Sequence, residues 1–203
     1  MLGKTHMAAG VAASLLIMQP KNIQELILGT GVSAIGAVIS DIDSGTSERH
    51  KDADKIIFMT LAAAAAMIAI EYIWHVGLYR KIMSNSSAAR IVTAFAAFLV
   101  ICAFGKEQPH RSFMHSILAL ALLAGCVAVF LPLMVPYFSI AFISHLVLDF
   151  LNRKGERLLY PLHCRFSLGI CSSKGLVNKL ICKAGCRTSV GVFVLLLADI
   201  CLF

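Results

Sequence analysis

The sequence predicts an all-α, polytopic membrane bundle of about six to seven membrane helices, some of them shorter than a full span. Two features of the composition support this: 59% of the 203 residues are hydrophobic, and only 14% are charged. The mean hydropathy of +0.82 also exceeds that of water-soluble domains. This composition excludes a disordered chain and a small secreted disulfide scaffold.

Seven apolar runs, separated by short polar or proline-containing breaks, predict the individual helices. A helix needs about 20 residues to cross the hydrocarbon core, so we expect the first, sixth and seventh runs to stop short of one interface. No Gly/Ser linker divides the chain, which predicts a single transmembrane domain over residues 1–203. The runs are Thr5 to Met18, Ile23 to Ile39, Lys55 to Trp74, Ala88 to Phe104, Phe113 to Leu131, Pro136 to Leu151 and Ser189 to Phe203.

The basic residues predict the orientation of these helices. If the runs cross alternately, most of the 18 basic residues fall on the side that holds the N-terminus and residues 40–54, 105–112 and 152–188. The positive-inside bias makes this side cytoplasmic. Segment 152–188 has Glu156 as its single acidic residue. We expect this basic cytoplasmic segment either to lie against anionic lipid headgroups or to act only as a topology signal.

Histidines and aspartates of the kind that bind metals stand at the ends of four runs. Under the predicted topology, all of these ends lie on the cytoplasmic side. His145 and Asp149 are four residues apart, which places them on one face of a helix. The candidate ligands are His6, Asp41, Asp43, His110, His115, His145 and Asp149.

Imidazole and carboxylate ligands suit Zn²⁺, Mn²⁺ or Fe²⁺. The number of candidates predicts one or two divalent transition metals, with Zn²⁺ or Mn²⁺ expected and Asp41 or Asp43 as the bridge between two ions. A metal-bound water would supply a nucleophile near neutral pH. Arg111 is the expected clamp for an anionic oxygen. Asp149 is a candidate general base as well as a ligand.

Several motifs resemble the YdjM-like family of bacterial inner-membrane metal-dependent hydrolases. They are Thr5-His6, Asp41-Ile42-Asp43-Ser44, His110-Arg111-Ser112-Phe113-Met114-His115-Ser116, and Ser144-His145-Leu146-Val147-Leu148-Asp149 with Leu158-Leu159-Tyr160-Pro161 downstream. The resemblance runs from Thr5 to about Gly169. It implies a polytopic enzyme of the inner membrane whose His and Asp boxes hold the metal. Ser40 stands where the family usually has a proline.

Two main functions remain open at this level, and a structural membrane adaptor is a third, weaker alternative. The first is a hydrolase for a phosphoester, or for an acyl ester or amide, in a lipid or lipid-like substrate. The second is a divalent-metal or proton transporter that uses the same side chains. Because the ionisable groups gather on one side, the enzyme is favoured. The expected partners are membrane lipids and no nucleic acid. The sequence also leaves open whether Cys164, Cys171, Cys182 and Cys186 bind a second metal.

Overall fold

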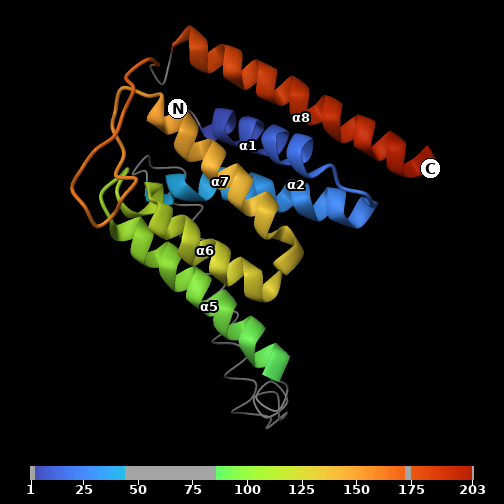
Figure 1. Ribbon diagram of the computed structural model, residues 1–203, viewed down its shortest axis with the longest axis horizontal. Coiled ribbons are helices and arrows are strands. Elements are labelled where there is room, and N and C mark those ends of the chain that lie inside the picture. Colours follow the sequence, from blue (N-terminus) through green and yellow to red (C-terminus); the bar gives the residue numbers. More distant parts are fainter. Residues whose placement is uncertain (1–2, 44–85, 172–174, 203) are drawn as a thin grey trace, which may run out of the picture.

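A computed structural model describes residues 3–43, 86–171 and 175–202 as a bundle of long helices (Figure 1). Short 3-10 turns link some of them, and the described residues contain no β-strand apart from two isolated bridges. This confirms the all-α prediction. The predicted run from Lys55 to Trp74 lies outside the described residues. The elements are α1 (Gly3–Met18), α2 (Ile23–Val38), η1 (Ile39–Asp43), α5 (Ser86–Glu107), η2 (Phe113–His115), α6 (Ile117–Phe130), η3 (Pro132–Met134), α7 (Val135–Phe150) and α8 (Leu176–Leu202).

Four helical segments of the described chain are long and apolar enough to cross a membrane. They are Ile23–Asp43, Ser87–Glu107, Pro132–Phe150 and Leu176–Leu202, and α6 is a shorter apolar helix. Helix α1 has 16 residues, which is less than a full span, as its sequence predicts. The membrane bundle with some short helices is therefore confirmed.

The last helix differs from the sequence prediction. Helix α8 has 27 residues and begins at Leu176 instead of Ser189, so the expectation that the seventh run is short was wrong. The sixth run was also expected to be short, but it lies in the helical segment Pro132–Phe150, which is long enough to cross. Lys179, Lys183 and Arg187 interrupt the apolar run, but lysine and arginine are good helix formers and these three side chains lie exposed on the helix. Part of the basic segment 152–188 is therefore helical, and its described residues up to 171 form an irregular loop that begins at residue 151.

Helices α1, α2 and α7 approach one another closely through small residues. A Cβ atom on Gly10 of α1 would lie 2.6 Å from the Cβ atom of Ala37 in α2. A Cβ atom on Gly36 would lie 2.7 Å from the backbone oxygen of Phe138 in α7. Small residues at such crossings let helices pack closely within a membrane. This contact holds the end of α2 against α7.

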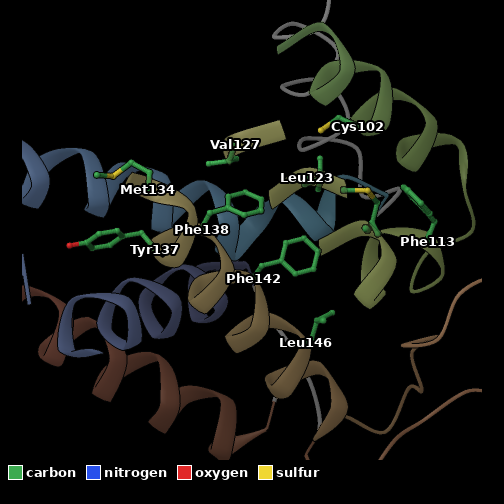
Figure 2. Close-up of a cluster of buried hydrophobic side chains, with 11 residues drawn as sticks. Cys102, Phe113, Leu123, Val127, Met134, Tyr137, Phe138, Phe142 and Leu146 are labelled. Carbon is green, nitrogen blue, oxygen red and sulfur yellow. The ribbon is translucent and has the colours of Figure 1, made fainter. Parts of the chain in front are cut away.

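The main apolar cluster lies between α6, α7 and the η2 turn. Figure 2 shows Phe138 and Phe142 of α7 directed toward the region of Leu123 in α6 and Phe113 in η2. Each of these four side chains is buried. Their packing fixes the start of α6 beside α7, so the polar residues next to Phe113 are held near the end of α7.

Candidate metal centre

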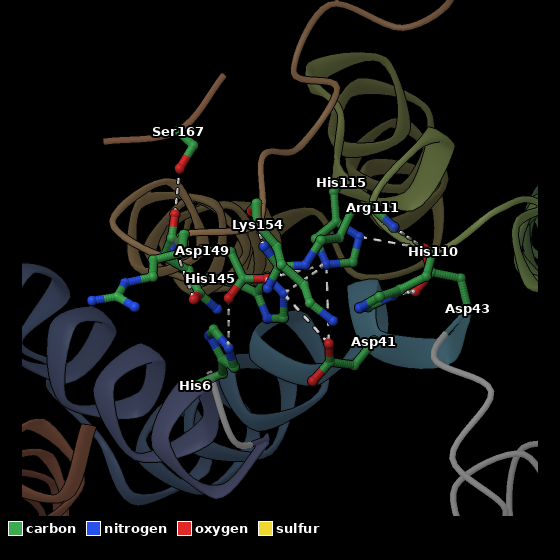
Figure 3. A network of polar contacts seen from close by, with 12 residues as sticks. His6, Asp41, Asp43, His110, Arg111, His115, His145, Asp149, Lys154 and Ser167 are labelled. Atoms are coloured by element: carbon green, nitrogen blue, oxygen red, sulfur yellow. Dashed lines mark hydrogen bonds and ion pairs between the residues drawn. The ribbon is translucent and has the colours of Figure 1, made fainter. Parts of the chain in front are cut away.

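Polar side chains from four separate segments converge at one end of the bundle (Figure 3). The segments are the start of α1, the η1 turn after α2, the turn with η2 before α6, and the last turns of α7. The structure brings together every residue of the predicted ligand set: His6, Asp41, Asp43, His110, His115, His145 and Asp149.

These residues form three groups, each with its potential ligand atoms within 4.8 Å of one another. Two residues, His115 and His145, each occur in two of the groups. The groups are therefore one continuous cluster that offers ligands for more than one cation. The groups are His6, Asp41 and His145; Asp43, His110 and His115; and His115, His145 and Asp149.

His115 lies in the middle of the cluster. Its Nε2 is 3.3 Å from Nε2 of His145 and 3.6 Å from Oδ2 of Asp149. Oδ1 of Asp41 lies 4.0 Å from Nε2 of His115 and 3.9 Å from Nε2 of His145. Bonds of 2.0–2.1 Å to a tetrahedral ion place its ligand atoms about 3.4 Å apart. The observed spacings therefore fit side chains that surround a divalent cation.

A backbone acceptor orients His145. Its Nδ1 lies 2.7 Å from the carbonyl oxygen of Ala37, to which it donates a hydrogen bond. A neutral imidazole that donates through Nδ1 carries its lone pair on Nε2, the atom that faces the cluster. Histidines that bind metals commonly have such an acceptor on the other ring nitrogen.

Asp43 plays a different structural part from Asp41. Its Oδ1 lies 2.7 Å from Nδ1 of His110, and its Oδ2 accepts the backbone N–H of Arg111 at 3.1 Å. The same Oδ2 is 3.4 Å from Nδ1 of His115. Asp43 thus orients two histidines and fixes the turn between them. Asp41, which lies close to two Nε2 atoms, is the better placed of the two candidate bridges.

The surroundings of His6 show whether the cluster suits a cation. Within the described part of the chain, neither ring nitrogen of His6 makes a hydrogen bond, although His6 is fully buried. Its ring stacks on His145 with the centroids 3.9 Å apart, and its Nε2 is 3.3 Å from Oδ1 of Asp149. Because buried polar groups are nearly always partnered, the Nδ1 atom, for which no partner is found among the described residues, fits the ligand set of a metal ion.

Carboxylates dominate the electrostatic surroundings of His115. Burial lowers the pKa of His115, but the carboxylates of Asp149 and Asp43 outweigh this effect and raise its pKa to about 9. The same carboxylates would attract a divalent cation.

Arg111 lies beside Asp149. Its Nη2 is 2.7 Å from Oδ2 of Asp149, and its Nη1 donates to the carbonyl oxygen of Lys154. The backbone of Arg111 has a φ of +65°, in the left-handed region. The guanidinium that the sequence predicts as an anion clamp therefore also holds Asp149, and an anion would share it with that carboxylate.

Solvent reaches the cluster at His110. The His110 side chain is 39% exposed, whereas its partner Asp43 is fully buried. The other candidate ligands are buried as well. The cluster therefore lies inside the helix bundle, and His110 connects it to the surface.

Sequence reasoning overlooked Glu156, which is also fully buried at this end of the bundle. The sequence feature that could have pointed to Glu156 is that it is the one acidic residue in the basic segment 152–188. The cysteines whose role the sequence left open belong to none of the metal-type groups found among the described residues. Cys182 and Cys186 lie on α8, Cys164 is exposed in the loop, and all are free thiols.

The chain matches one family model, described as the YdjM inner membrane protein, over residues 1–203. No curated protein and no solved structure matches it significantly. The matched region contains all four helix ends that form the His and Asp cluster. Because the match covers the whole sequence, the chain belongs to the YdjM inner membrane protein family.

Proposed function

We propose that this protein is a metal-dependent hydrolase that acts on a phosphoester in a lipid or lipid-like substrate at the cytoplasmic face of the inner membrane. The observation that carries this proposal is the convergence of seven histidines and aspartates from four segments at one end of a membrane bundle. Ionisable groups within or near a bilayer are functional candidates by default.

The residues of the cluster have distinct proposed roles, except that Asp149 has two. His6, Asp41, His115, His145 and Asp149 would hold one or two divalent cations, and Asp43 would orient His110 and His115. Bound Zn²⁺ or Mn²⁺ would supply an activated water and stabilise the charge at a phosphoryl group. Arg111 would bind an anionic oxygen of the substrate, and Asp149, which Arg111 contacts, would accept the proton of the water.

The surroundings of the cluster support a lipid substrate. The loop over residues 151–171 exposes Leu159, Leu162 and Leu168, and it also exposes Arg153 and Arg165. Exposed apolar and basic side chains together suit the boundary between acyl chains and anionic headgroups. A substrate could keep its acyl chains in the membrane while its phosphate reaches His110, the most exposed residue of the cluster.

The test is an assay of the purified, metal-loaded protein in vesicles of mixed bacterial lipids. Released phosphate, headgroups and fatty acids are followed with and without Zn²⁺ or Mn²⁺. We expect metal-dependent release of a phosphate-containing product, and loss of this release in His145→Ala. His163→Ala is the matched control, because His163 is exposed in the loop. The absence of any product, together with metal flux across the vesicles, would favour the transporter instead.

A further inference from the structure

Glu156 is a fully buried carboxyl group in the loop after α7. Its exposed fraction is 0%, and neither of its carboxyl oxygens makes a hydrogen bond within the part of the chain that the structure describes. Burying a carboxyl group without a partner is unfavourable, and such groups are rare in native proteins. Its position therefore requires an explanation.

Backbone hydrogen bonds hold Glu156 beside the candidate metal centre. Its N–H donates to the carbonyl oxygen of Phe166 at 3.0 Å, and its carbonyl accepts the N–H of Phe166 at 2.9 Å. The N–H of the next residue, Arg157, donates to the carbonyl of Arg111 at 3.1 Å. Since Arg111 also binds the carbonyl of Lys154, the loop is fastened to the centre on both sides of Glu156.

The charged groups that act on Glu156 belong to the same centre. Burial raises its pKa to about 8, His115 and Arg111 oppose this rise, and Asp149 adds to it. The carboxyl group is therefore largely uncharged at neutral pH when no cation is present. A divalent cation nearby would favour its ionised form, and the proton would pass to the solvent.

The charge balance of the centre favours one more carboxylate. Asp41, Asp43 and Asp149 bring three negative charges, and Arg111 brings one positive charge to the same buried region. Two divalent cations would leave this region with excess positive charge. An ionised Glu156 would reduce that excess at no cost in coordination geometry.

We propose that Glu156 is a fourth carboxylate of the centre, which strengthens the binding of divalent cations by its charge without being one of their ligands. Glu156 belongs to none of the three groups of converging ligand atoms among the described residues, so the proposal assigns it a charge near the cation and not a bond to it. This inference rests on the proposed function because it requires a bound cation. It does not depend on the proposed hydrolysis.

The test compares wild type with Glu156→Gln, which keeps the shape of the side chain and removes its charge. Zn²⁺ and Mn²⁺ are titrated by calorimetry into the metal-free, full-length protein in detergent. We expect cation affinity to fall about 10- to 100-fold, as for other groups around a metal site. Titrations in buffers of different ionisation enthalpy count the released protons, and we expect fewer protons per cation in Glu156→Gln.

Two further variants separate charge from shape. Glu107→Gln is the matched control, because Glu107 is an exposed glutamate at the end of α5 and its loss should leave affinity unchanged. Glu156→Asp keeps the charge and should retain most of the affinity. Equal weakening in Glu156→Asp and Glu156→Gln, with a lower Tm in both, would show a merely structural role and overturn the inference.

The outcomes also separate this inference from the proposed function. Tight cation binding by wild type without lipid hydrolysis would refute the hydrolase and leave the Glu156 result standing. Unchanged affinity and unchanged proton release in Glu156→Gln, with hydrolysis intact, would refute the role of Glu156 alone. A wild-type protein that binds neither cation would refute both.

Discussion

Nε2 of His115 and Nε2 of His145 face each other at 3.3 Å, although the two residues are 30 positions apart in the chain. The other ring nitrogen of His145 donates to the carbonyl of Ala37, and that of His115 lies 3.4 Å from a carboxylate oxygen of Asp43. Two neutral rings oriented in this way would direct lone pairs at each other. A proton or a cation between them removes this repulsion, so protons and divalent cations should compete for the centre.

His145→Ala should abolish stoichiometric binding of the divalent cation, because it removes an Nε2 atom shared by two of the ligand groups. Asp43→Ala should also lower the metal content, since it frees His110 and His115 to turn away. Metal analysis of the purified proteins checks both results. His163→Ala should keep its metal, and unchanged metal in both folded variants would contradict the ligand assignment.

The sequence predicts the helix ends that form the centre because apolar runs and their breaks are local features. Their convergence followed from alternate crossing of the membrane, a simple topological rule. The different positions of Asp41 and Asp43 could not be predicted, because they depend on the η1 turn and on the left-handed backbone of Arg111. Neither feature leaves a periodic signal in the sequence.

The length of α8 and the burial of Glu156 were missed for a related reason. An apolar run is taken to begin or end where charged residues occur. Helix α8, however, continues through the exposed Lys179 and Lys183. Glu156 follows Gly155 in a basic loop, where a carboxylate would ordinarily be solvated. The loop that carries it pairs with Phe166 and with Arg111, a long-range arrangement that no local sequence pattern indicates.

Arg111→Lys should reduce turnover more than metal content. Lysine keeps the positive charge but loses the planar fork that contacts Asp149 and could also bind an anionic oxygen. We expect a loss of turnover on the order of 100-fold, as for removal of one donor that stabilises a developing anion. Parallel metal analysis and lipid-hydrolysis assays check this. An equal loss of metal and turnover would show that Arg111 acts only by holding Asp149.

Gly36→Ala should destabilise the bundle, whereas Gly31→Ala in the same helix should not. The added Cβ at Gly36 would meet the backbone oxygen of Phe138 at 2.7 Å, and nothing lies within 4 Å of a Cβ at Gly31. Overpacking of this kind costs about 1–3 kcal/mol. Thermal unfolding in detergent compares the two variants. Since Gly36 precedes η1, weaker cation binding should accompany the lower Tm, and equal Tm values would contradict the close α2–α7 contact.

The loop of residues 151–171 should be cytoplasmic and the η3 turn should face the opposite side. The basic residues favour this orientation. In a background whose exposed cysteines are replaced by serine, Leu133→Cys should react with an impermeant thiol reagent on cells whose outer membrane is permeabilised. His163→Cys should react only after the inner membrane is opened. Leu133 is 79% exposed, so its accessibility suits this assay. The reverse labelling pattern would place the centre outside.

The stability of the metal-free protein should depend on pH through Glu156. Its pKa rises from 4.5 to about 8 in the folded protein, chiefly because of burial. Between these values the folded protein keeps a proton that the unfolded chain has released, so stability falls as pH rises through this window. His115, Asp149 and Arg111 act on Glu156 and remain in the Glu156→Gln variant.

The difference between wild type and Glu156→Gln therefore isolates this one carboxyl group. With a chelator present, the Tm of wild type should fall relative to that of the variant between about pH 5 and about pH 8, and the difference should level off below pH ~4.5, where both states of Glu156 are protonated. Fluorescence-monitored melting in detergent provides the measurement. If the two curves run parallel over this range, Glu156 ionises as easily in the folded protein as in water, and its burial beside the centre would be disproved. A convergence of the curves after Zn²⁺ is added would instead show that the cation stabilises the ionised carboxylate, because binding to the folded state offsets the cost of its charge.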